Sequence, residues 1–366
     1  MKRRDFVTSA ATGGLVAGAA AAASSFPAPA IAQGTKQLKM VTTWPKNFPG
    51  LGTGAENLAK RITAMSDGAL DVKVFAAGEL VPAFESFDAV SSGNAEMSHS
   101  VSYYWQGKTP AFNFFATVPF GLTATEQAAW IAYGGGQELW DDLCAGFNVK
   151  PFPRASTGVQ MGGWYKKEIN SLDDFQGLKF RMPGLGGEVL RRLGAAVVNL
   201  PGGEIFPALQ AGTIDGTEWV GPWNDLAFGF YKVANFYYGP GFHEPSTTGE
   251  VLVNKGVWDE MTDGEKAIIE ASVQAEAWRE FAEFNANNAD SLKVLLDDHG
   301  VQLRSFSAEL FAEIRKVAGE VVAEVGATDG TTKEIYDSYM AFQEKAIGWS
   351  KLSEQGYLNA RSPIES

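Results

Sequence analysis

The chain has 366 residues, a formal net charge of −13 and a 45% hydrophobic composition in which 12% of the residues are aromatic. A chain this acidic is unsuited to holding nucleic acid, because phosphate binding requires a concentrated basic surface. The apolar content, with only 20% charged residues, excludes a disordered chain and predicts a large packed core.

The N-terminal segment has the pattern of an export signal. A basic start at residues 1–5 precedes a small-residue apolar run from 10 to 23, and residues 30–32 fit a small-x-small cleavage site. The run is too short and too rich in Ala and Gly to span a bilayer. The paired arginines predict the twin-arginine variant, with an ordinary Sec signal as the alternative. We therefore expect residues 1–32 to be cleaved and the protein to leave the cytoplasm.

The next segments alternate between strand and helix patterns. A buried strand is expected at 38–44, a helix from about 54 to 67 that Gly68 ends, a strand at 70–75, a helix near 84–91 and an extended segment at 97–104. Strand–helix–strand at this spacing is the βαβ unit of an α/β domain with a mainly parallel sheet. Cys144 is the only cysteine, so an exported chain without disulfides must depend on its core.

The same succession returns before the pattern changes to long helices. It comprises a capped turn at 171–175, strands at 178–182, 197–200 and 215–220, helices at 187–193 and 201–211, and then long helices at 258–298, 307–325 and 333–353. The length exceeds what one core usually serves, so we expect two α/β lobes and a helical C-terminal third. The chain should cross between the lobes more than once, and the cleft between them is the expected ligand site.

Signatures of catalysis are weak. The three histidines, His99, His243 and His299, lack metalloprotease spacing, and no paired cysteines or serine elbow accompany them. The glycines at 184–187 follow a strand and precede a helix, but the final glycine of a dinucleotide-binding loop is missing. The sequence therefore favours a binding protein over an enzyme.

Arg181 is the most informative polar residue. Alternation places Leu178, Phe180 and Met182 on one face of a strand and Arg181 on the other, at the carboxyl end where α/β domains bind ligands. A guanidinium there can hold a carboxylate through two parallel hydrogen bonds, which a lysine cannot reproduce. The alternative is a surface arginine paired with Asp173 or Asp174.

Other polar side chains lie in similarly apolar, glycine-rich surroundings. They are Gln160 within 158–164, Glu218 and Trp219 within 215–221, and Glu244 within 241–245. Each also has a structural interpretation: the glutamates as solvated loop acids, Gln160 as a partner for buried backbone, and Trp219 as core. Singly, none of them identifies a site.

Together these segments resemble a known family. From residue 44 to about 357 the chain is similar to the extracytoplasmic solute receptors of TRAP (tripartite ATP-independent periplasmic) transporters, through the stretches 77–80, 172–181 and 208–216. Four further stretches, at 102–105, 157–164, 217–222 and 236–244, resemble the branch that binds α-keto acids with a metal. The resemblance implies an α/β, two-lobed, periplasmic-binding-protein-like fold with a ligand cleft between the lobes and long C-terminal helices.

We expect lobe I over residues 33–160 plus 246–305, lobe II over 161–245, and a C-terminal helical region over 306–366. The branch is known for homodimers in which C-terminal helices cross over, so a homodimer is expected. The apolar faces that would serve it comprise Phe311, Ile314, Val317, Val321, Val322, Tyr336, Tyr339, Met340 and Phe342. The alternative is that these faces pack on the chain's own lobes.

The resemblance also implies roles for individual residues. Arg181 would clamp the carboxylate of the acid, and oxygens of Gln160, Glu218, Glu244 and the backbone of Trp219 would hold the metal ion. Gln160, Glu218 and Trp219 would also border the acid, with a hydrogen bond from Tyr104. The pair at 242–243 departs from the bulky aromatic pair expected before the acidic residue, which leaves the size of the ligand open.

Charge explains why an ion belongs in such a site. Glu218, Glu244 and a bound carboxylate, set against Arg181 alone, leave two uncompensated negative charges in a closing cleft, which is very costly. A hard cation with oxygen ligands compensates them. Ca²⁺ would neutralise the site, whereas Na⁺ would leave one negative charge. Charge counting therefore favours Ca²⁺, but the resemblance favours Na⁺, so the sequence does not decide between the two ions. Zn²⁺ is disfavoured because no thiolate and no certain imidazole is present.

These features predict a periplasmic receptor that captures a small 2-oxo or 2-hydroxy monocarboxylate, resembling pyruvate, 2-oxobutyrate or lactate, and delivers it to TRAP membrane permease subunits. Two alternatives come from other classes. An exported oxidoreductase would need a cofactor fingerprint, and a sensory binding module would share every site residue.

Overall fold

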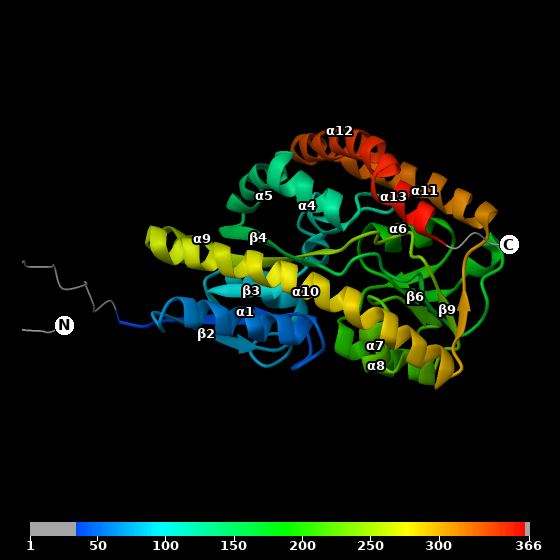
Figure 1. Ribbon diagram of the computed structural model, residues 1–366, viewed down its shortest axis with the longest axis horizontal. Coiled ribbons are helices and arrows are strands. Elements are labelled where there is room, and N and C mark those ends of the chain that lie inside the picture. Colours follow the sequence, from blue (N-terminus) through cyan, green and yellow to red (C-terminus); the bar gives the residue numbers. More distant parts are fainter. Residues whose placement is uncertain (1–33, 363–366) are drawn as a thin grey trace, which may run out of the picture. The chain divides into compact units, whose positions relative to one another are not determined.

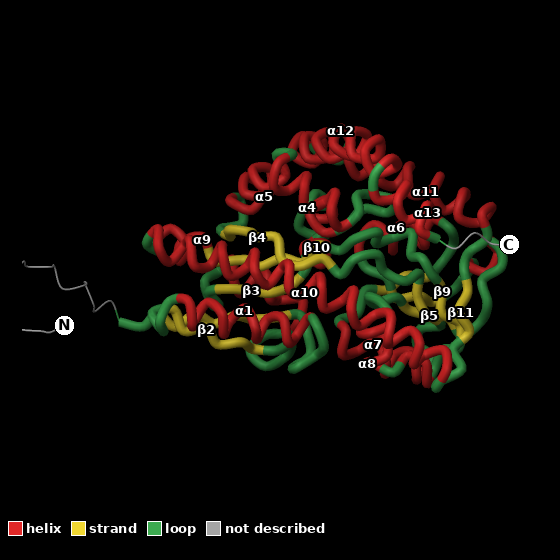
Figure 2. Tube along the Cα trace, viewed as in Figure 1, coloured by secondary structure: helices red, strands yellow, loops and turns green. Residues whose placement is uncertain are grey.

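Two mixed β-sheets organise the computed structural model, which describes residues 34–362. The predicted signal peptide at 1–32 lies outside the described residues. Figure 2 shows the strands as two separate groups with helices around each. The predicted class, an α/β fold with two lobes and long C-terminal helices, is confirmed. Among the described residues, no helix is long and apolar enough to cross a membrane.

The first sheet has the strand order β2-β1-β3-β10-β4. Its strands are β1 (Lys36–Thr42), β2 (Leu70–Phe75), β3 (Met97–Ser100), β4 (Val149–Ser156) and β10 (Thr248–Asn254). β1 pairs in parallel with β2 and β3, whereas β10 runs antiparallel to both β3 and β4. The predicted strand–helix–strand unit is confirmed, because β1, β2 and β3 pair in parallel, but the sheet as a whole is not mainly parallel. β10 enters from a distant part of the chain, which local patterns do not reveal.

Helices surround this sheet and fill the chain between its strands. They are α1 (Leu51–Met65), η1 (Ala83–Glu85), α2 (Ser86–Ser91), η2 (Ser102–Trp105), α3 (Phe112–Ala116), α4 (Ala124–Tyr133) and α5 (Gly136–Ala145). α1 buries Leu51, Leu58 and Ile62, which share one helix face by their spacing. The extended segment expected at 97–104 ends at Ser100 and gives way to η2, which carries Tyr103 and Tyr104.

The second sheet has the order β11-β9-β5-β8-β6-β7. Its elements are β5 (Gly163–Tyr165), η3 (Leu172–Phe175), β6 (Lys179–Arg181), α6 (Gly184–Arg192), β7 (Ala196–Val198), α7 (Gly202–Ala211), β8 (Gly216–Thr217), α8 (Pro222–Phe228), η4 (Phe230–Lys232), β9 (Phe236–Tyr238) and β11 (Gln302–Arg304). β11 pairs with β9, although the expected boundary placed it with lobe I. The strand expected at 215–220 ends at Thr217, because the backbone then turns into the loop that carries Glu218.

One helix packs against elements of both lobes. α9 (Lys255–Asp259) is followed by α10 (Asp263–Asp297), which contacts α1 and β4 on the first side and α8 on the second (Figure 1). The expected helix at 258–298 is interrupted because Thr262 forms a capping box with Glu265 and starts α10 anew. The chain thus passes between the sheets after β4, after β9 and along α10, as predicted.

The C-terminal helices are α11 (Ala308–Gly326), α12 (Gly330–Leu352) and α13 (Glu354–Arg361). Their predicted apolar faces pack on the chain's own core: Ile314, Val321 and Tyr339 are buried there. Leu122 N donates to the Tyr339 hydroxyl at 2.8 Å, which fixes α12 against the first lobe. The alternative interpretation of these faces is therefore what the structure shows, and they give no support to a dimer.

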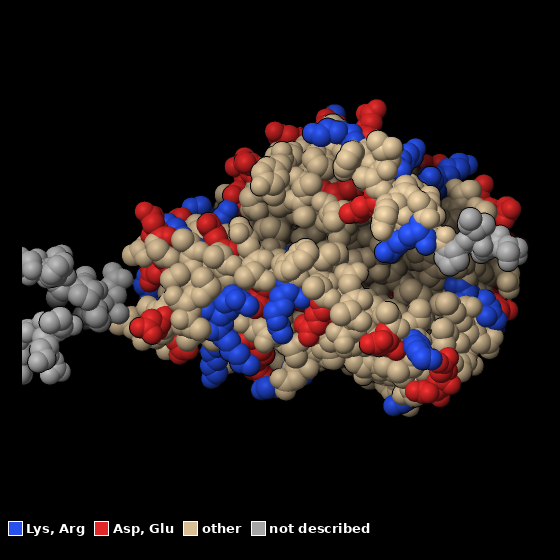
Figure 3. Space-filling model, viewed as in Figure 1, with Lys and Arg blue, Asp and Glu red and all other residues tan. Residues whose placement is uncertain are grey.

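Surface charge agrees with the composition. On the face shown in Figure 3, Lys and Arg side chains are interspersed with Asp and Glu rather than gathered into a basic stripe. Several of them form exposed ion pairs along helices, such as Lys255 with Asp259 and Lys333 with Asp337. Pairs of this kind contribute little to stability and give the face a mixed sign.

Candidate functional site

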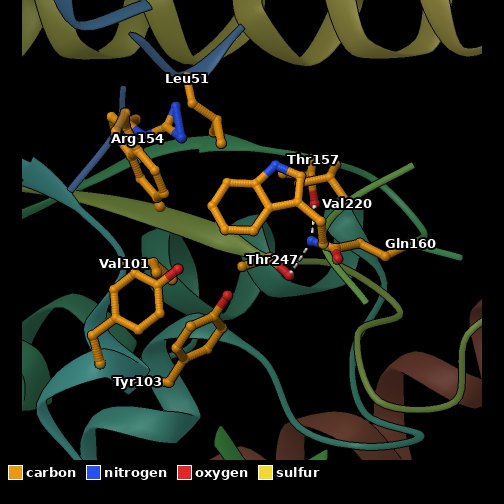
Figure 4. Close-up of a pocket in the computed structure, with 12 residues that line it drawn as sticks. Leu51, Val101, Tyr103, Arg154, Thr157, Gln160, Val220 and Thr247 are labelled. Atoms are coloured by element: carbon orange, nitrogen blue, oxygen red, sulfur yellow. Dashed lines mark hydrogen bonds between the residues drawn. The ribbon is translucent and has the colours of Figure 1, made fainter. Parts of the chain in front are cut away.

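The carboxyl ends of strands from both sheets meet at one cavity (Figure 4). The first sheet contributes residues after β1 and β3 and at the end of β4, and the second contributes the loop after β8. The lining residues are Trp44, Leu51, Val101, Tyr103, Tyr104, Arg154, Thr157, Gln160, Trp219, Val220, Thr247 and Gly249. The cavity volume is about 20 Å³, room for about one water molecule. An organic acid can enter only if the two sides of the cavity move apart.

Arg181 ends β6 and is 1% exposed, so the surface alternative proposed from the sequence was wrong. Its Nη1 donates to the Glu218 carboxylate and, at 3.2 Å, to the Glu218 backbone carbonyl; its Nε donates to Leu200 O at 3.1 Å. Nη2 reaches the Tyr104 hydroxyl at 3.4 Å, and the guanidinium lies 5.2 Å from the Trp219 ring centre. Burial opposes the charge on Arg181, but Glu218 and the tyrosines outweigh it and raise the pKa of Arg181.

Two buried carboxylates lie close together beside this arginine. Ligand atoms of Glu218, His243 and Glu244 all lie within 4.8 Å of one another, and all three side chains are buried. His243 Nε2 is 3.4 Å from the second carboxylate oxygen of Glu218. Burial, and then the charge of Glu218, raises the pKa of Glu244 to about 7. The raised pKa shows that Arg181 alone does not balance both carboxylates in their ionised form.

Gln160 supplies a further oxygen. Its Nε2 donates to the hydroxyls of Thr157 and Thr247, each at 3.0 Å, and the dashed lines in Figure 4 mark both bonds. Its Oε1 is buried and accepts no hydrogen bond from any described residue. A buried polar atom without a partner is costly unless something else satisfies it. Gln160 N also donates to Glu244 O at 3.0 Å, which joins the two loops.

These groups suit a hard cation. Gln160 and Glu244 converge through Thr247, which accepts from the amide of Gln160 and donates to the Glu244 carboxylate. Carboxylate and amide oxygens are the donors that Ca²⁺ prefers. The orphaned oxygen of Gln160 and the crowded carboxylates of Glu218 and Glu244 therefore fit an ion, with His243 beside them.

All six residues predicted for the site lie in one connected network. Arg181 contacts Glu218, Tyr104 and Trp219, while Gln160 and Glu244 are linked through their loops. Trp219, 4% exposed, borders the cavity and also belongs to a buried hydrophobic cluster, so its interpretation as a core residue is confirmed alongside its place in the wall.

Sequence reasoning missed other members of the site. Arg154 lines the cavity from β4, a strand that the sequence did not predict because Pro151 and Pro153 interrupt its pattern. Thr157 and Thr247 orient Gln160, but hydroxyls in loops carry no signal of their own. His243 contacts Glu218 and was noted only for its position before Glu244.

Comparisons with known proteins agree with one another. Residues 40–329 match the model of bacterial extracellular solute-binding protein, family 7. A monocarboxylate 2-oxoacid-binding periplasmic protein of Nostoc sp. is 42% identical over 324 residues, which is 88% of each chain.

Solved structures show the same likeness. A TRAP periplasmic solute-binding protein from Pseudoalteromonas atlantica, with bound sodium and pyruvate, is 40% identical and superposes with a TM-score of 0.87 over 90% of this chain and 100% of its own. A TRAP transporter solute-binding protein from Bordetella bronchiseptica is 36% identical, with a TM-score of 0.87 over 89% and 97% of the two chains. It is described as a mixed-occupancy dimer with copurified calcium and picolinate in one active site.

Proposed function

The chain belongs to family 7 of the bacterial extracellular solute-binding proteins, the TRAP transporter receptors, and from that premise we propose that it captures small 2-oxo monocarboxylates together with a metal ion. Similar proteins bind pyruvate or picolinate beside sodium or calcium. Pyruvate and 2-oxobutyrate are the expected ligands, and a 2-hydroxy acid such as lactate offers the same pair of oxygens.

One observation carries the proposal. Buried Arg181 lies behind the cavity wall, in contact with Tyr104 and Trp219 of that wall, and two buried carboxylates, Glu218 and Glu244, lie close together beside it. In the same wall, the buried amide oxygen of Gln160 has no partner among the described residues. Such a cluster has excess negative charge and an unused acceptor, so it is suited to a cation and an anion that arrive together.

Each side chain then has a role that its position supports. Arg181 holds the carboxylate of the acid, with Tyr104, Trp219 and Gln160 around it. Oxygens of Gln160, Glu218, Glu244 and the backbone carbonyl of Trp219 hold Na⁺ or Ca²⁺. Bound there, the ion supplies positive charge that offsets the glutamates and attracts the oxygens of the acid.

The hydrogen bonds of Arg181 explain how the chain prepares for the acid. Nε donates to the backbone carbonyl of Leu200. Nη1 donates to the backbone carbonyl of Glu218 and to one oxygen of its carboxylate. Within the described part of the chain, Nη2 makes one long hydrogen bond, to the Tyr104 hydroxyl at 3.4 Å. A carboxylate can form two parallel bonds to the Nη groups only when the Glu218 side chain turns to another partner. Glu218 therefore couples the two halves of the site.

Location and partners follow from the family. TRAP receptors of this kind are periplasmic proteins that pass their ligand to membrane permease subunits, and we place this chain there as a receptor rather than an enzyme. A homodimer is also proposed, on the likeness to the Bordetella protein. It would use apolar side chains that remain exposed near the C-terminus, Trp349, Leu352 and Tyr357.

Calorimetry on the mature protein, purified in defined salts, tests the function. Pyruvate, 2-oxobutyrate and lactate should bind, and succinate, which lacks a 2-oxygen, should bind far more weakly. Equal affinity for succinate and pyruvate would contradict the proposed chelation, and no binding of any 2-oxo acid would contradict the function.

A further inference from the structure

A second buried arginine lines the cavity from the first lobe. Arg154 lies near the end of β4, and Figure 4 shows it across the cavity from Gln160. Its guanidinium carbon is 5.8 Å from the Trp44 ring centre. Trp44 in turn meets Trp219 edge to face at 6.2 Å, and Trp219 lies against Arg181. Two arginines, one from each sheet, therefore flank a pair of tryptophans.

The partner of Arg154 is a carboxylate of α10. Arg154 Nη1 donates to Glu280, and the two side chains are 3% and 1% exposed. Glu280 does not line the cavity, so the arginine faces the cavity and its counter-charge lies behind it. Burial raises the pKa of Glu280, and Arg154 opposes that rise.

Two glycines make room for this pair. A Cβ at position 249 would collide with the Arg154 guanidinium, and a Cβ at position 54 would lie 2.8 Å from a carboxylate oxygen of Glu280. Within residues 34–362, Arg154 Nε and Glu280 Oε2 have no hydrogen-bond partner. The Arg154–Glu280 pair is thus closely surrounded by backbone, yet the Nε–H of Arg154 donates no hydrogen bond within the described residues. A buried arginine with a spare donor could attract a second carboxylate if its charge were not cancelled.

We propose that Glu280 determines the charge class of the ligand, by cancelling Arg154 so that the first-lobe wall of the cavity accepts neutral tails and rejects a second carboxylate. The inference rests on the proposed function, since it concerns the tail of a 2-oxo acid held at Arg181. A dicarboxylate placed here would lose its hydration without gaining a free positive charge. A binding site can reject a ligand by leaving one of its charged groups desolvated and without an opposite charge.

The test compares two ligands of nearly the same shape in calorimetry. 2-Oxoglutarate carries a second carboxylate where 5-methyl-2-oxohexanoate carries an isopropyl group. The wild-type protein should prefer the isopropyl compound. Glu280→Gln keeps a hydrogen-bond acceptor but frees the charge of Arg154, and should shift the affinity ratio toward 2-oxoglutarate by about 10- to 100-fold.

Glu276→Gln is the matched control. Glu276 lies one turn earlier on α10, is also buried, and pairs with Arg61 and Arg279, neither of which lines the cavity. Its loss should leave the ratio unchanged. A second variant, Arg154→Met with Glu280→Leu, replaces the pair by apolar side chains and should keep the wild-type preference.

The outcomes separate the two proposals. If the wild-type protein binds no 2-oxo acid, the proposed function and this inference both fail. If it binds pyruvate but Glu280→Gln leaves the ratio unchanged, or Glu276→Gln shifts it equally, only the role of Glu280 is overturned. A shift toward 2-oxoglutarate in the double variant, which has no arginine at this wall, would overturn it as well.

Discussion

The two lobes present the same motif with different consequences. Each contributes one fully buried arginine–glutamate pair to the cavity region, Arg181 with Glu218 and Arg154 with Glu280. Glu218 lies beside His243 and a second carboxylate, Glu244, where a bound ion would give it another partner. Glu280 is confined by α10 and by the backbone at Gly54. A buried ion pair can take part in binding when its carboxylate has an alternative partner. Without one, as in the Arg154–Glu280 pair, it serves the fold, and we call it the framework pair.

The largest expected effect is on stability, and it comes from breaking the framework pair. Arg154→Met leaves Glu280 buried without its cation, which should lower the free energy of unfolding by about 3–5 kcal/mol in urea denaturation. Removing both charges, as in the double variant above, should recover most of that loss. A decrease below about 1 kcal/mol in the single variant would show that the two pairs do not differ as described.

The next effect is on the affinity for pyruvate, and it comes from the Arg181–Glu218 pair. Arg181→Lys keeps the charge but loses the planar fork, so pyruvate binding should weaken by about 1.5–3 kcal/mol while the fold survives. Calorimetry with a circular-dichroism control for folding measures both. Unchanged affinity for pyruvate would show that Arg181 does not hold the acid.

The last effect depends on pH and concerns a buried carboxyl that has no cationic partner among the described residues. Burial raises the pKa of Glu250 on β10 to about 8, and its partner is Trp105 Nε1 at 2.5 Å. Its raised pKa means that the protonated form is favoured in the folded state. The stability it contributes is therefore complete below the unfolded pKa of about 4.3 and is lost as the pH rises toward 8.

Glu250→Gln should remove that part of the pH dependence. Between pH 5 and 8 the wild-type free energy of unfolding should fall relative to the variant, by at most about 1.4 kcal/mol per pH unit. Parallel stability curves for the two proteins across this range would contradict the raised pKa.

The two arginine–glutamate pairs also differ in how much of each could be predicted from the sequence. The strand pattern around Arg181 predicted its strand, its face and its place at a carboxyl end, because alternation and strand ends are local properties. Arg154 gave no such signal, because its strand β4 contains two prolines and was not predicted, and its partner Glu280 is 126 residues away on α10. Likewise β10 joins the first sheet through pairings that no local pattern contains.

Packing of the C-terminal helices was equally out of reach. An apolar helix face shows that something covers it, but not whether the cover is the same chain or another copy. Here Tyr339 and Ile314 pack inward, so the predicted dimer faces serve the monomer's own core. The resemblance supplied the ligand roles, and geometry then showed which residues could share them.

The central claim is that the acid and the ion bind interdependently through the loops that carry Gln160, Glu218 and Glu244. Pyruvate titrations of the wild-type protein, in sodium- or calcium-containing buffer and again in choline salts with EGTA, test it most directly. The account predicts an affinity about 5- to 150-fold lower without the ion, and an equal effect of pyruvate on ion affinity. Identical pyruvate affinity in the two buffers would contradict it and leave Arg181 as the sole anchor.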